Sequence, residues 1–389
     1  MKINKQINYG SQFIDNSDTK YLIKALNQNK ISSGPFVEKF EESLKKLLNS
    51  KFVYSCNSGT SALHLAFVAA GLKKKDKIIL PSINFIAAKN IADIMELDYY
   101  FADIDCNTGQ ITPKSVTECI EKNKIKNLKA IVLMYIGGYP RNINHFFKIK
   151  KKYNCLLIED ACHAFGASYL INKKKYNIGS CKHCDISTFS FHPLKTITTG
   201  EGGAITTNNF LISKRIKEFR SHGFELYQKY RWNYKSKNYG LNYRMSDINA
   251  ALGYSQINKL NLFLNKRKKI YLSYLKDLDG YNNALEIIKK ENNTNPSYHL
   301  VLAIINFKKL NIKKDKFLMM LEKKNIFCQF HYKPCYKLGK RYKNIKTLHQ
   351  SEHYEKNTIS LPIHFSISGF ELEYIIKQVK KIIDQCKKN

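Results

Sequence analysis

Short apolar runs alternate with segments of helical period between residues 77 and 158, and this alternation limits the possible folds more than any other feature of the chain. The pattern is typical of β/α units, in which parallel strands form a sheet that helices cover on both faces. We expect functional residues beyond the carboxyl ends of these strands, where such sheets bind their ligands. The predicted strands are 77–81, 99–104, 129–135 and 155–158, and the predicted helices are 86–95, 113–123 and 144–153.

The length of 389 residues exceeds what one ordinary hydrophobic core supports, so two domains are expected. We predict an N-terminal arm with a large α/β domain over residues 1–255, and a smaller α+β domain over residues 256–389. The smaller domain is expected to contain a strand from 326 to 332. Its last helix should bury one face, because apolar residues recur at helical spacing between 372 and 382.

The net charge is strongly positive, with 65 Lys and Arg residues against 31 Asp and Glu residues. Such an excess is typical of nucleic-acid-binding proteins. Here, however, lysines are spread along the whole chain, arginine is scarce, and no nucleic-acid-binding motif accompanies them. We therefore predict no nucleic-acid partner. A basic nucleic-acid-binding or regulatory protein remains the alternative from a different functional class.

The sequence contains no apolar run long enough to span a membrane, and its start lacks the apolar stretch of a signal peptide. We therefore expect a cytoplasmic protein without a membrane partner. The ten cysteines are scattered, and reduced thiols are expected in that compartment. Cys181 and Cys184 form a CxxC, but no second pair or suitably spaced His/Cys cluster completes it, so we predict no metal site.

Lys195 lies in a polar, glycine-containing turn between two β-rich runs, 185–191 and 204–207. Its neighbours in sequence include two phenylalanines, a proline and a leucine, and an apolar environment favours the neutral amine. A neutral amine is what Schiff-base chemistry requires. A solvated surface lysine is the alternative.

Three further residues lie where the predicted strands end. Asp160 closes an apolar strand, and a buried carboxylate there is costly unless it has a partner. Phe85 follows the strand 77–81 and is either a core residue or a ligand contact. His163 is either a ligand contact or a satisfied histidine at a helix start.

Residues 57–60 precede a segment of helical period, so Ser58, Gly59 and Thr60 are expected at a helix N-terminus. Free N–H groups there attract a phosphate, although a simple helix cap by Ser58 or Thr60 explains the same pattern. Ser190 should point to the sheet face opposite to Phe189 and Phe191, since side chains alternate along a strand.

The string FSFHPLKTITTGEGGAITTN, residues 189–208, resembles the cofactor-lysine segment of the DegT/DnrJ/EryC1/StrS family of sugar aminotransferases. These are fold-type I enzymes that use pyridoxal 5'-phosphate (PLP), with a large domain of mostly parallel sheet and a smaller C-terminal domain. The resemblance implies catalytic roles for Lys195, Asp160 and His163. It also implies a homodimer with shared active sites, because Asn242 matches a residue that reaches the neighbouring subunit's cofactor; otherwise Asn242 belongs to a capping segment before Ser246. The implied PLP contacts are Lys195, Asp160, His163, Ser58, Gly59, Thr60, Phe85, Ser190 and Asn242.

The segment FHYKPCY, residues 330–336, resembles a motif of those family members that make the precursor of pseudaminic acid. This resemblance implies amino transfer from L-glutamate to the C4 keto group of a UDP-linked 2-acetamido-2,6-dideoxy-4-keto hexose. A GDP-linked 4-keto sugar, as in perosamine synthesis, is the alternative substrate. A PLP-dependent sugar dehydratase is disfavoured, because histidine replaces the lysine there. The implied substrate contacts are Tyr9, Lys30, Ile31, Ser32, Ser33, His331, Tyr332, Lys333 and Pro334.

Overall fold

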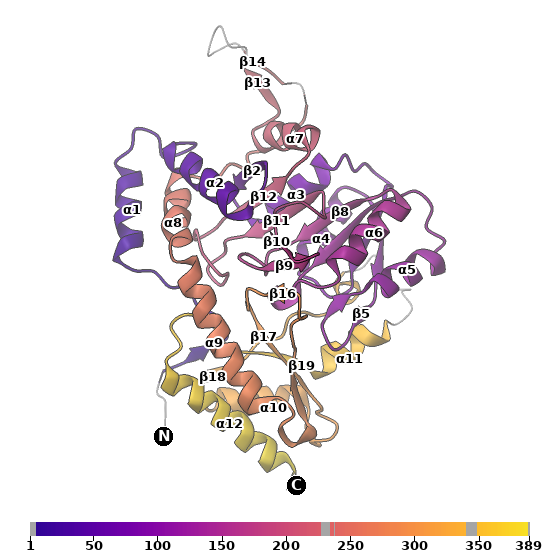
Figure 1. The fold of residues 1–389 in the computed structure, drawn as a ribbon, viewed down its shortest axis with the longest axis vertical. Coiled ribbons are helices and arrows are strands. Elements are labelled where there is room, and N and C mark those ends of the chain that lie inside the picture. Colours follow the sequence, from indigo (N-terminus) through magenta and orange to yellow (C-terminus); the bar gives the residue numbers. More distant parts are fainter. Residues whose placement is uncertain (1–4, 227–233, 237, 340–347, 388–389) are drawn as a thin grey trace.

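The computed structural model describes residues 5–226, 234–236, 238–339 and 348–387 (Figure 1). A seven-stranded sheet forms the centre of the larger part of the molecule. Only β12 runs antiparallel to its neighbours in this sheet, so the mostly parallel arrangement is confirmed. The strands in spatial order are β2 (Phe52–Cys56), β12 (Gly203–Thr207), β11 (Ile186–Ser190), β8 (Leu156–Asp160), β7 (Leu128–Met134), β3 (Lys77–Pro81) and β4 (Asp98–Ala102).

Apolar side chains project from both faces of this sheet, because successive residues of a strand point to opposite sides. In β3, Ile78 and Leu80 enter one hydrophobic cluster and Ile79 enters the other. Strands that are apolar on both faces require helices on both faces, as predicted. The first face is covered by α3 (Gly59–Ala69), α4 (Ala87–Ile94) and α7 (Phe210–Arg220), and the second by α2 (Pro35–Leu48), α5 (Pro113–Lys122) and α6 (Ile143–Tyr153).

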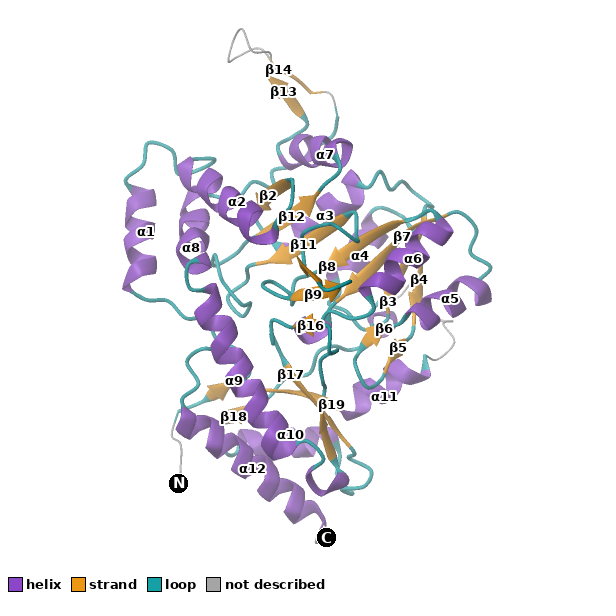
Figure 2. Ribbon diagram, in the orientation of Figure 1, coloured by secondary structure: helices purple, strands orange, loops and turns teal. Residues whose placement is uncertain are grey.

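The smaller part of the molecule follows the long helix α9 (Leu260–Leu278), which runs from the large sheet to the C-terminal elements (Figure 2). A three-stranded antiparallel sheet packs there against α9, α10 (Lys314–Glu322) and α12 (Gly369–Lys387). Its strands are β17 (Val301–Ile305) between β15 (Leu285–Ile287) and β19 (Thr358–Leu361).

The buried face predicted for the last helix is confirmed, since Ile375, Val379 and Ile382 of α12 lie in this core. A domain boundary at residues 255/256 stays a proposal; it would fall in the last turn of α8 (Asp247–Ile257).

The remaining elements are short or peripheral. Helix α8 packs against α1 and α2. The other elements are α1 (Asn16–Leu26), α11 (His349–Asn357), β1 (Ile7–Asn8) with β18 (Ile326–Phe327), β5 (Ile104–Asp105) with β6 (Gln110–Ile111), β9 (Ser168–Ile171) with β10 (Lys174–Asn177) and β16 (Thr294–Asn295), β13 (Phe224–Leu226) with β14 (Tyr234–Ser236), and three single 3₁₀ turns at Ile136–Gly138, Tyr281–Asn283 and Cys335–Lys337.

The strand predicted from 326 to 332 is wrong beyond its second residue. β18 ends at Phe327, because its parallel partner β1 is only two residues long. Gln329 then exchanges both backbone hydrogen bonds with Ser360, at 3.1 and 2.7 Å. After this single bridge the chain leaves the small sheet and turns towards the large one, which carries His331 and Tyr332 to the carboxyl ends of its strands.

Cys181 and Cys184 are free thiols buried beneath the large sheet. Their sulfur atoms lie 3.3 Å from the hydroxyl oxygens of Thr206 and Ser187, respectively. Hydroxyl partners and burial are what a packed structural cysteine requires.

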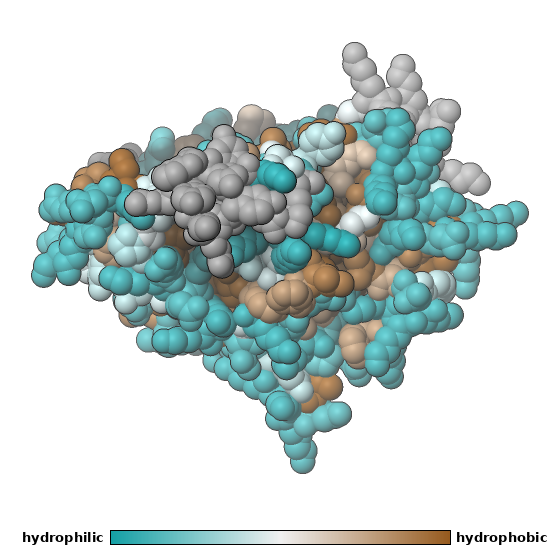
Figure 3. Space-filling view, turned by 90° about the horizontal axis from the view of Figure 1, so that it is seen from above, coloured by the Kyte–Doolittle hydropathy of each residue, from teal (hydrophilic) through white to brown (hydrophobic). Residues whose placement is uncertain are grey.

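Hydrophilic side chains cover most of the face shown in Figure 3, with smaller apolar areas between them. Within the described part of the chain, every helix is too short or too polar to cross a membrane.

Candidate active site

A cavity of about 480 Å³ opens at the carboxyl ends of the parallel strands. Several strands of the large sheet contribute to it through the residues that directly follow them or end them. These are Ser58–Thr60 after β2, Phe85 after β3, Met134 at the end of β7, Asp160, Cys162 and His163 at and after β8, and Ser190, His192, Leu194 and Lys195 at and after β11. The sheet thus gathers residues from distant parts of the chain at the edge predicted from its topology.

Lys195 projects into this cavity from the turn after β11. The backbone N–H of Lys195 donates to the carbonyl of His192 at 2.9 Å, which holds the turn. Burial lowers the pKa of the Lys195 amine, and the nearby Cys162 and Asp160 only partly oppose this effect. The amine of Lys195 is therefore neutral more often than the amine of a solvated lysine. The alternative of a solvated surface lysine is wrong.

Asp160 lies in the same cavity as Lys195, at the end of β8. Burial raises the pKa of its carboxyl group, while hydrogen bonds from Cys162 and Asn84 lower it. The side-chain amide of Asn84 donates to Oδ2 at 3.2 Å, and the backbone N–H of Cys162 donates to Oδ1 at 3.3 Å. These two bonds position the carboxylate but contribute no full charge, so a cation in the cavity would complete its partners.

The N-terminus of α3 faces the cavity beside β11. Ser58 caps the helix, its Oγ accepting from the backbone N–H of Ser61 at 3.0 Å, so the helix-cap interpretation is correct. The cap uses the N–H of the third helical residue and leaves those of Gly59 and Thr60 available for an anion. A Cβ on residue 59 would lie 2.7 Å from Cβ of Ser190, so only glycine lets the helix end come this close to the strand.

Phe85 is 53% exposed, so the interpretation as a core residue is wrong. Its ring lines the cavity, with its centre 5.9 Å from that of Tyr332. An aromatic face held at the edge of a cavity suits stacking on a flat ring.

Three histidines from distant segments meet around the cavity: His163, His299 and His331. The ring centre of His163 lies 4.3 Å from that of His299 and 6.3 Å from that of His331. Burial, followed by the charge of Lys195, lowers the pKa of all three, to about 3 for His331 and well below the usual value for the other two. The imidazoles are therefore neutral at physiological pH and act as hydrogen-bonding groups rather than as cations.

The hydrogen bonds of His163 determine where its single ring proton lies. The backbone N–H of Gly137 donates to Nδ1 at 3.3 Å, so Nδ1 is the acceptor and Nε2 carries the proton of the neutral ring. Nε2 lies 3.0 Å from the hydroxyl oxygen of Tyr332, which must then accept. No other hydrogen bond of the Tyr332 hydroxyl is present among the described residues, so its proton is available to a ligand in the cavity that Tyr332 lines.

The other predicted residues fall into two groups. Tyr9, His331 and Tyr332 line the cavity, with the ring of Tyr9 centred 5.1 Å from that of His331. Lys333 lines a separate groove on the other side of its segment, and Pro334 is buried outside both. Lys30, Ile31, Ser32, Ser33 and Asn242 are not among the described residues that line the cavity.

The loop 30–33 lies instead at the start of α8. The carbonyl of Ile31 accepts from the N–H of Asp247 at 2.9 Å, and Ser32 forms a backbone bridge with Ser246. The segment with Asn242 directly precedes this point and contacts Asn57, whose side-chain amide donates to the carbonyl of Asn242 at 3.4 Å. The loop and Asn242 therefore belong to one surface region.

Several residues of the cavity are not predicted by any pattern in the sequence. His299 has no local motif around it, and its position beside His163 depends on how β17 meets the large sheet. The side-chain Nδ1 of His299 is buried without a hydrogen-bond partner in the described structure. The missed lining residues are Leu63, Ala87, Met134, Cys162, His192, Leu194, Glu201, His299, Gln329 and Phe330.

The groups around the cavity fit PLP. A neutral amine suits its aldehyde, a buried carboxylate suits its ring nitrogen, and the α3 N-terminus beside Ser190 suits its phosphate. The glycine at position 59 supports this fit independently, because any side chain there would fill the space between the helix end and Ser190.

Comparisons with known proteins agree with this geometry. The chain is 35% identical to a UDP-4-amino-4,6-dideoxy-N-acetyl-beta-L-altrosamine transaminase of Campylobacter jejuni, over 98% of this chain and 99% of the relative. It is 29% identical to a GDP-perosamine synthase of Escherichia coli O157:H7, over 94% and 95% of the two chains. Among solved structures, it is similar to the Helicobacter pylori aminotransferase PseC, involved in the biosynthesis of pseudoaminic acid, with a TM-score of 0.89, 29% identity, and coverage of 98% of this chain and 100% of that one.

The match to a family model covers almost the whole chain, from residue 12 to residue 380. It includes both parts of the molecule and every segment that lines the cavity except Tyr9. The chain therefore belongs to the DegT/DnrJ/EryC1/StrS aminotransferase family.

Proposed function

We propose that this chain transfers the amino group of L-glutamate to the C4 keto group of a UDP-linked 2-acetamido-2,6-dideoxy-4-keto hexose, in the cytoplasm and with PLP as cofactor. The products are 2-oxoglutarate and the 4-amino sugar nucleotide. The observation that carries the proposal is the placement of Lys195 and Asp160 in one cavity of a family member. The names of relatives that are 31 to 35% identical favour this sugar as the substrate.

The groups that line the cavity have distinct roles in this reaction. When bound, PLP supplies an electron-withdrawing ring that acidifies the proton on the amino-bearing carbon. Nζ of Lys195, whose pKa is lowered by burial, accepts that proton in its neutral form and returns it, in opposite order for the two substrates. The negative charge of the Asp160 carboxylate would stabilise the protonated ring nitrogen of the cofactor, and the Phe85 side chain would stack on the ring.

The phosphate of the cofactor is assigned to the N–H groups of Gly59 and Thr60 and to the hydroxyls of Ser58 and Ser190. We assign Tyr9, His331 and Tyr332 to the sugar nucleotide, since they line the cavity opposite the large sheet. His163 would form a hydrogen bond with the cofactor's ring hydroxyl, or position the Tyr332 hydroxyl.

We further propose that the enzyme is a homodimer in which Asn242 and the loop 30–33 serve the partner's site. Both lie near the start of α8 and neither lines its own chain's cavity, which supports a common role across an interface. The cavity offers few cations to bind the diphosphate of the substrate, because its three histidines are neutral and Lys195 takes part in catalysis. Groups of a second chain would supply contacts for the diphosphate.

The test is to incubate the purified protein with PLP, glutamate and a panel of 4-keto nucleotide sugars, and to detect amino sugars by mass spectrometry. We expect the UDP-linked 2-acetamido sugar to be converted at least about tenfold faster, in kcat/KM, than GDP-4-keto-6-deoxymannose, which corresponds to about 1.4 kcal/mol of discrimination. The GDP sugar reacting faster would favour the alternative, perosamine synthesis, which the similarity to GDP-perosamine synthases motivates. Tight, salt-sensitive binding to duplex DNA without any amino transfer would favour the nucleic-acid-binding alternative.

Tyr332→Phe tests the hydroxyl that the His163 tautomer directs into the cavity. We expect kcat for the sugar half-reaction to fall roughly tenfold or more, because a donor to a bound polar group is typically worth 1–3 kcal/mol when buried. The glutamate half-reaction, followed by single-turnover absorbance, should change less. Tyr336→Phe is the control, since its hydroxyl donates to Glu352 at 3.2 Å outside the cavity. Equal effects of the two substitutions would contradict the assignment.

A further inference from the structure

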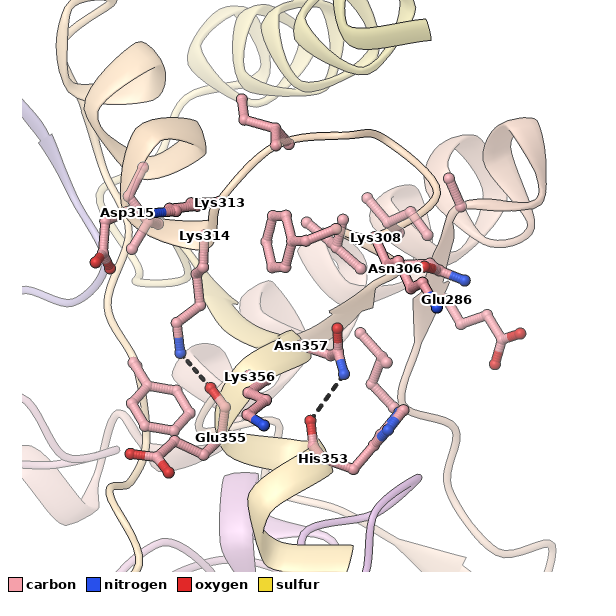
Figure 4. Close-up of a pocket in the computed structure, with 18 of the residues that line it drawn as sticks. Glu286, Asn306, Lys308, Lys313, Lys314, Asp315, His353, Glu355, Lys356 and Asn357 are labelled. Atoms are coloured by element: carbon pink, nitrogen blue, oxygen red, sulfur yellow. Dashed lines mark hydrogen bonds between the residues drawn. The ribbon is translucent and has the colours of Figure 1, made fainter.

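A second, larger cavity lies in the smaller part of the molecule (Figure 4). It is an open groove of about 1280 Å³, bounded by β15, β17, the start of α10, the segment 329–333 and the end of α11. We call it the lysine groove. It is separate from the active-site cavity, but Gln329 and Phe330 line both.

The lysine groove carries an excess of positive charge. Its cations are Lys308, Lys313, Lys314, Lys333 and Lys356, and its carboxylates are Glu286, Asp315 and Glu355. The Glu355 carboxylate is already paired with Lys337, which lies outside the groove. None of the five lysines takes part in an ion pair within the described structure, and they outnumber the three carboxylates that line the groove.

Lys314 occupies a fixed position within the groove. Its ammonium lies 3.7 Å from the centre of the Phe330 ring and donates to the backbone carbonyl of Glu355 (Figure 4). Burial lowers its pKa, with Glu355 and Asp315 opposing and Lys333 adding to the effect. One of the three N–H groups of this ammonium is used by the carbonyl, so two remain for a ligand. Because the side chain is already held in place, a ligand would not have to order it on binding.

The lining of the groove includes apolar side chains as well as polar ones, and we call the apolar part of this surface the apolar floor. Phe330, Ile312 and Leu318 contribute apolar surface, and the amides of Asn306 and Asn357 stand beside it. The side chain of Asn357 is oriented by donating to the carbonyl of His353 at 2.9 Å. Such a surface suits a ligand with a flat, partly apolar portion next to a multiply charged group, rather than a simple anion.

We propose that the lysine groove binds a nucleoside diphosphate. The diphosphate would lie among Lys313, Lys314 and Lys356, and the nucleoside on the apolar floor. The volume exceeds that of a typical small-molecule pocket, roughly 300–1,000 Å³, so the size admits such a ligand. The groove lies in a single chain, and the three lysines assigned to the diphosphate have no part in the proposed amino transfer.

Binding in the groove should also be felt by the active site. The Phe330 ring contacts Lys314 on the groove side, and the next two residues, His331 and Tyr332, line the catalytic cavity. A nucleotide that draws Lys314 towards its phosphates changes the contact that holds Phe330. Ligand binding at either site should therefore change the conformation or mobility of the segment 329–333.

The experiment compares UDP binding to the full-length wild-type protein and to a Lys313→Ala/Lys356→Ala variant by calorimetry, at low and high salt. Both lysines are exposed, so the fold should tolerate the change. The matched control is Lys122→Ala/Lys126→Ala, which removes the same charge from an exposed region around the end of α5. We expect the groove variant to weaken one binding event at least about tenfold, since charge-assisted hydrogen bonds to phosphate are lost, and the control to leave it unchanged.

Hydrogen exchange locates the binding event. UDP should slow exchange in segments 306–318 and 329–333 of the wild-type protein, and this protection should be lost in the groove variant. Amino-transfer activity without added UDP should be unchanged in both variants, which separates this proposal from the proposed function. Equal UDP affinity in the wild-type protein and the groove variant would overturn the proposal. Inorganic pyrophosphate binding as tightly as UDP would overturn the role given to the apolar floor.

Discussion

Replacing Lys195 by alanine is expected to reduce amino transfer at least about 10⁴-fold, the largest loss of any single substitution. The amine is required both for covalent attachment of the cofactor and for moving the proton at the reacting carbon, and general acid–base catalysis alone contributes typically 10²–10⁴-fold. The measurement is the rate of product formation by mass spectrometry. Borohydride treatment followed by peptide mapping should give a PLP adduct at Lys195 in the wild-type protein and none in the variant.

Lys182→Ala is the control for this substitution. Lys182 lies on the same large part of the molecule, is exposed, and does not line the cavity. It should retain full activity and the reducible adduct. A Lys195→Ala protein that kept a borohydride-reducible chromophore would contradict the assignment of the lysine.

Replacing Asp160 by asparagine should give the second-largest loss, about 10³-fold in kcat. The side chain keeps its shape but loses the charge that balances the ring nitrogen, and a preorganised electrostatic partner in a site removed from water is worth about 10²–10³-fold. PLP affinity should fall as well, which equilibrium dialysis measures independently of turnover.

Glu159→Gln provides a matched control from the same strand. Glu159 is also buried, but successive residues of a strand point to opposite faces, so its carboxylate lies on the side away from the cavity. There it accepts from the hydroxyls of Tyr135, at 2.7 Å, and Ser187. We expect Glu159→Gln to lower the free energy of unfolding by about 1–3 kcal/mol with kcat little changed. Asp160→Asn should instead lower kcat and leave the free energy of unfolding little changed. Equal losses of kcat in the two variants would show that the effect on catalysis arises from the strand and not from the carboxylate in the cavity.

Local sequence patterns were sufficient for the elements that position the catalytic pair. The apolar run ending at Asp160 predicted a buried strand with a carboxylate at its end, and β8 ends at that residue. The capping pattern at Ser58 predicted the start of α3, which the structure confirms. Both predictions succeeded because backbone geometry within a few residues depends on side chains that are adjacent in sequence.

The strand predicted to 332 failed for the opposite reason. Residues 328–332 have a pattern compatible with a strand, but a strand requires a partner, and β1 offers only two residues. The release of this segment from the small sheet is what brings His331 and Tyr332 to the active site. No property of the segment itself predicts that outcome.

The sequence by itself determined the fold class, the turn that carries Lys195 and the strand that ends at Asp160, because the period of apolar residues decides which side of each element is buried. Only the tertiary structure decided which strand ends meet, since the spatial order β2-β12-β11-β8-β7-β3-β4 differs from the order along the chain. It also brought His163, His299 and His331 together and left Phe85 exposed at the cavity. Contacts between residues more than a hundred positions apart depend on how the two parts of the molecule pack together, and no local spacing encodes that packing.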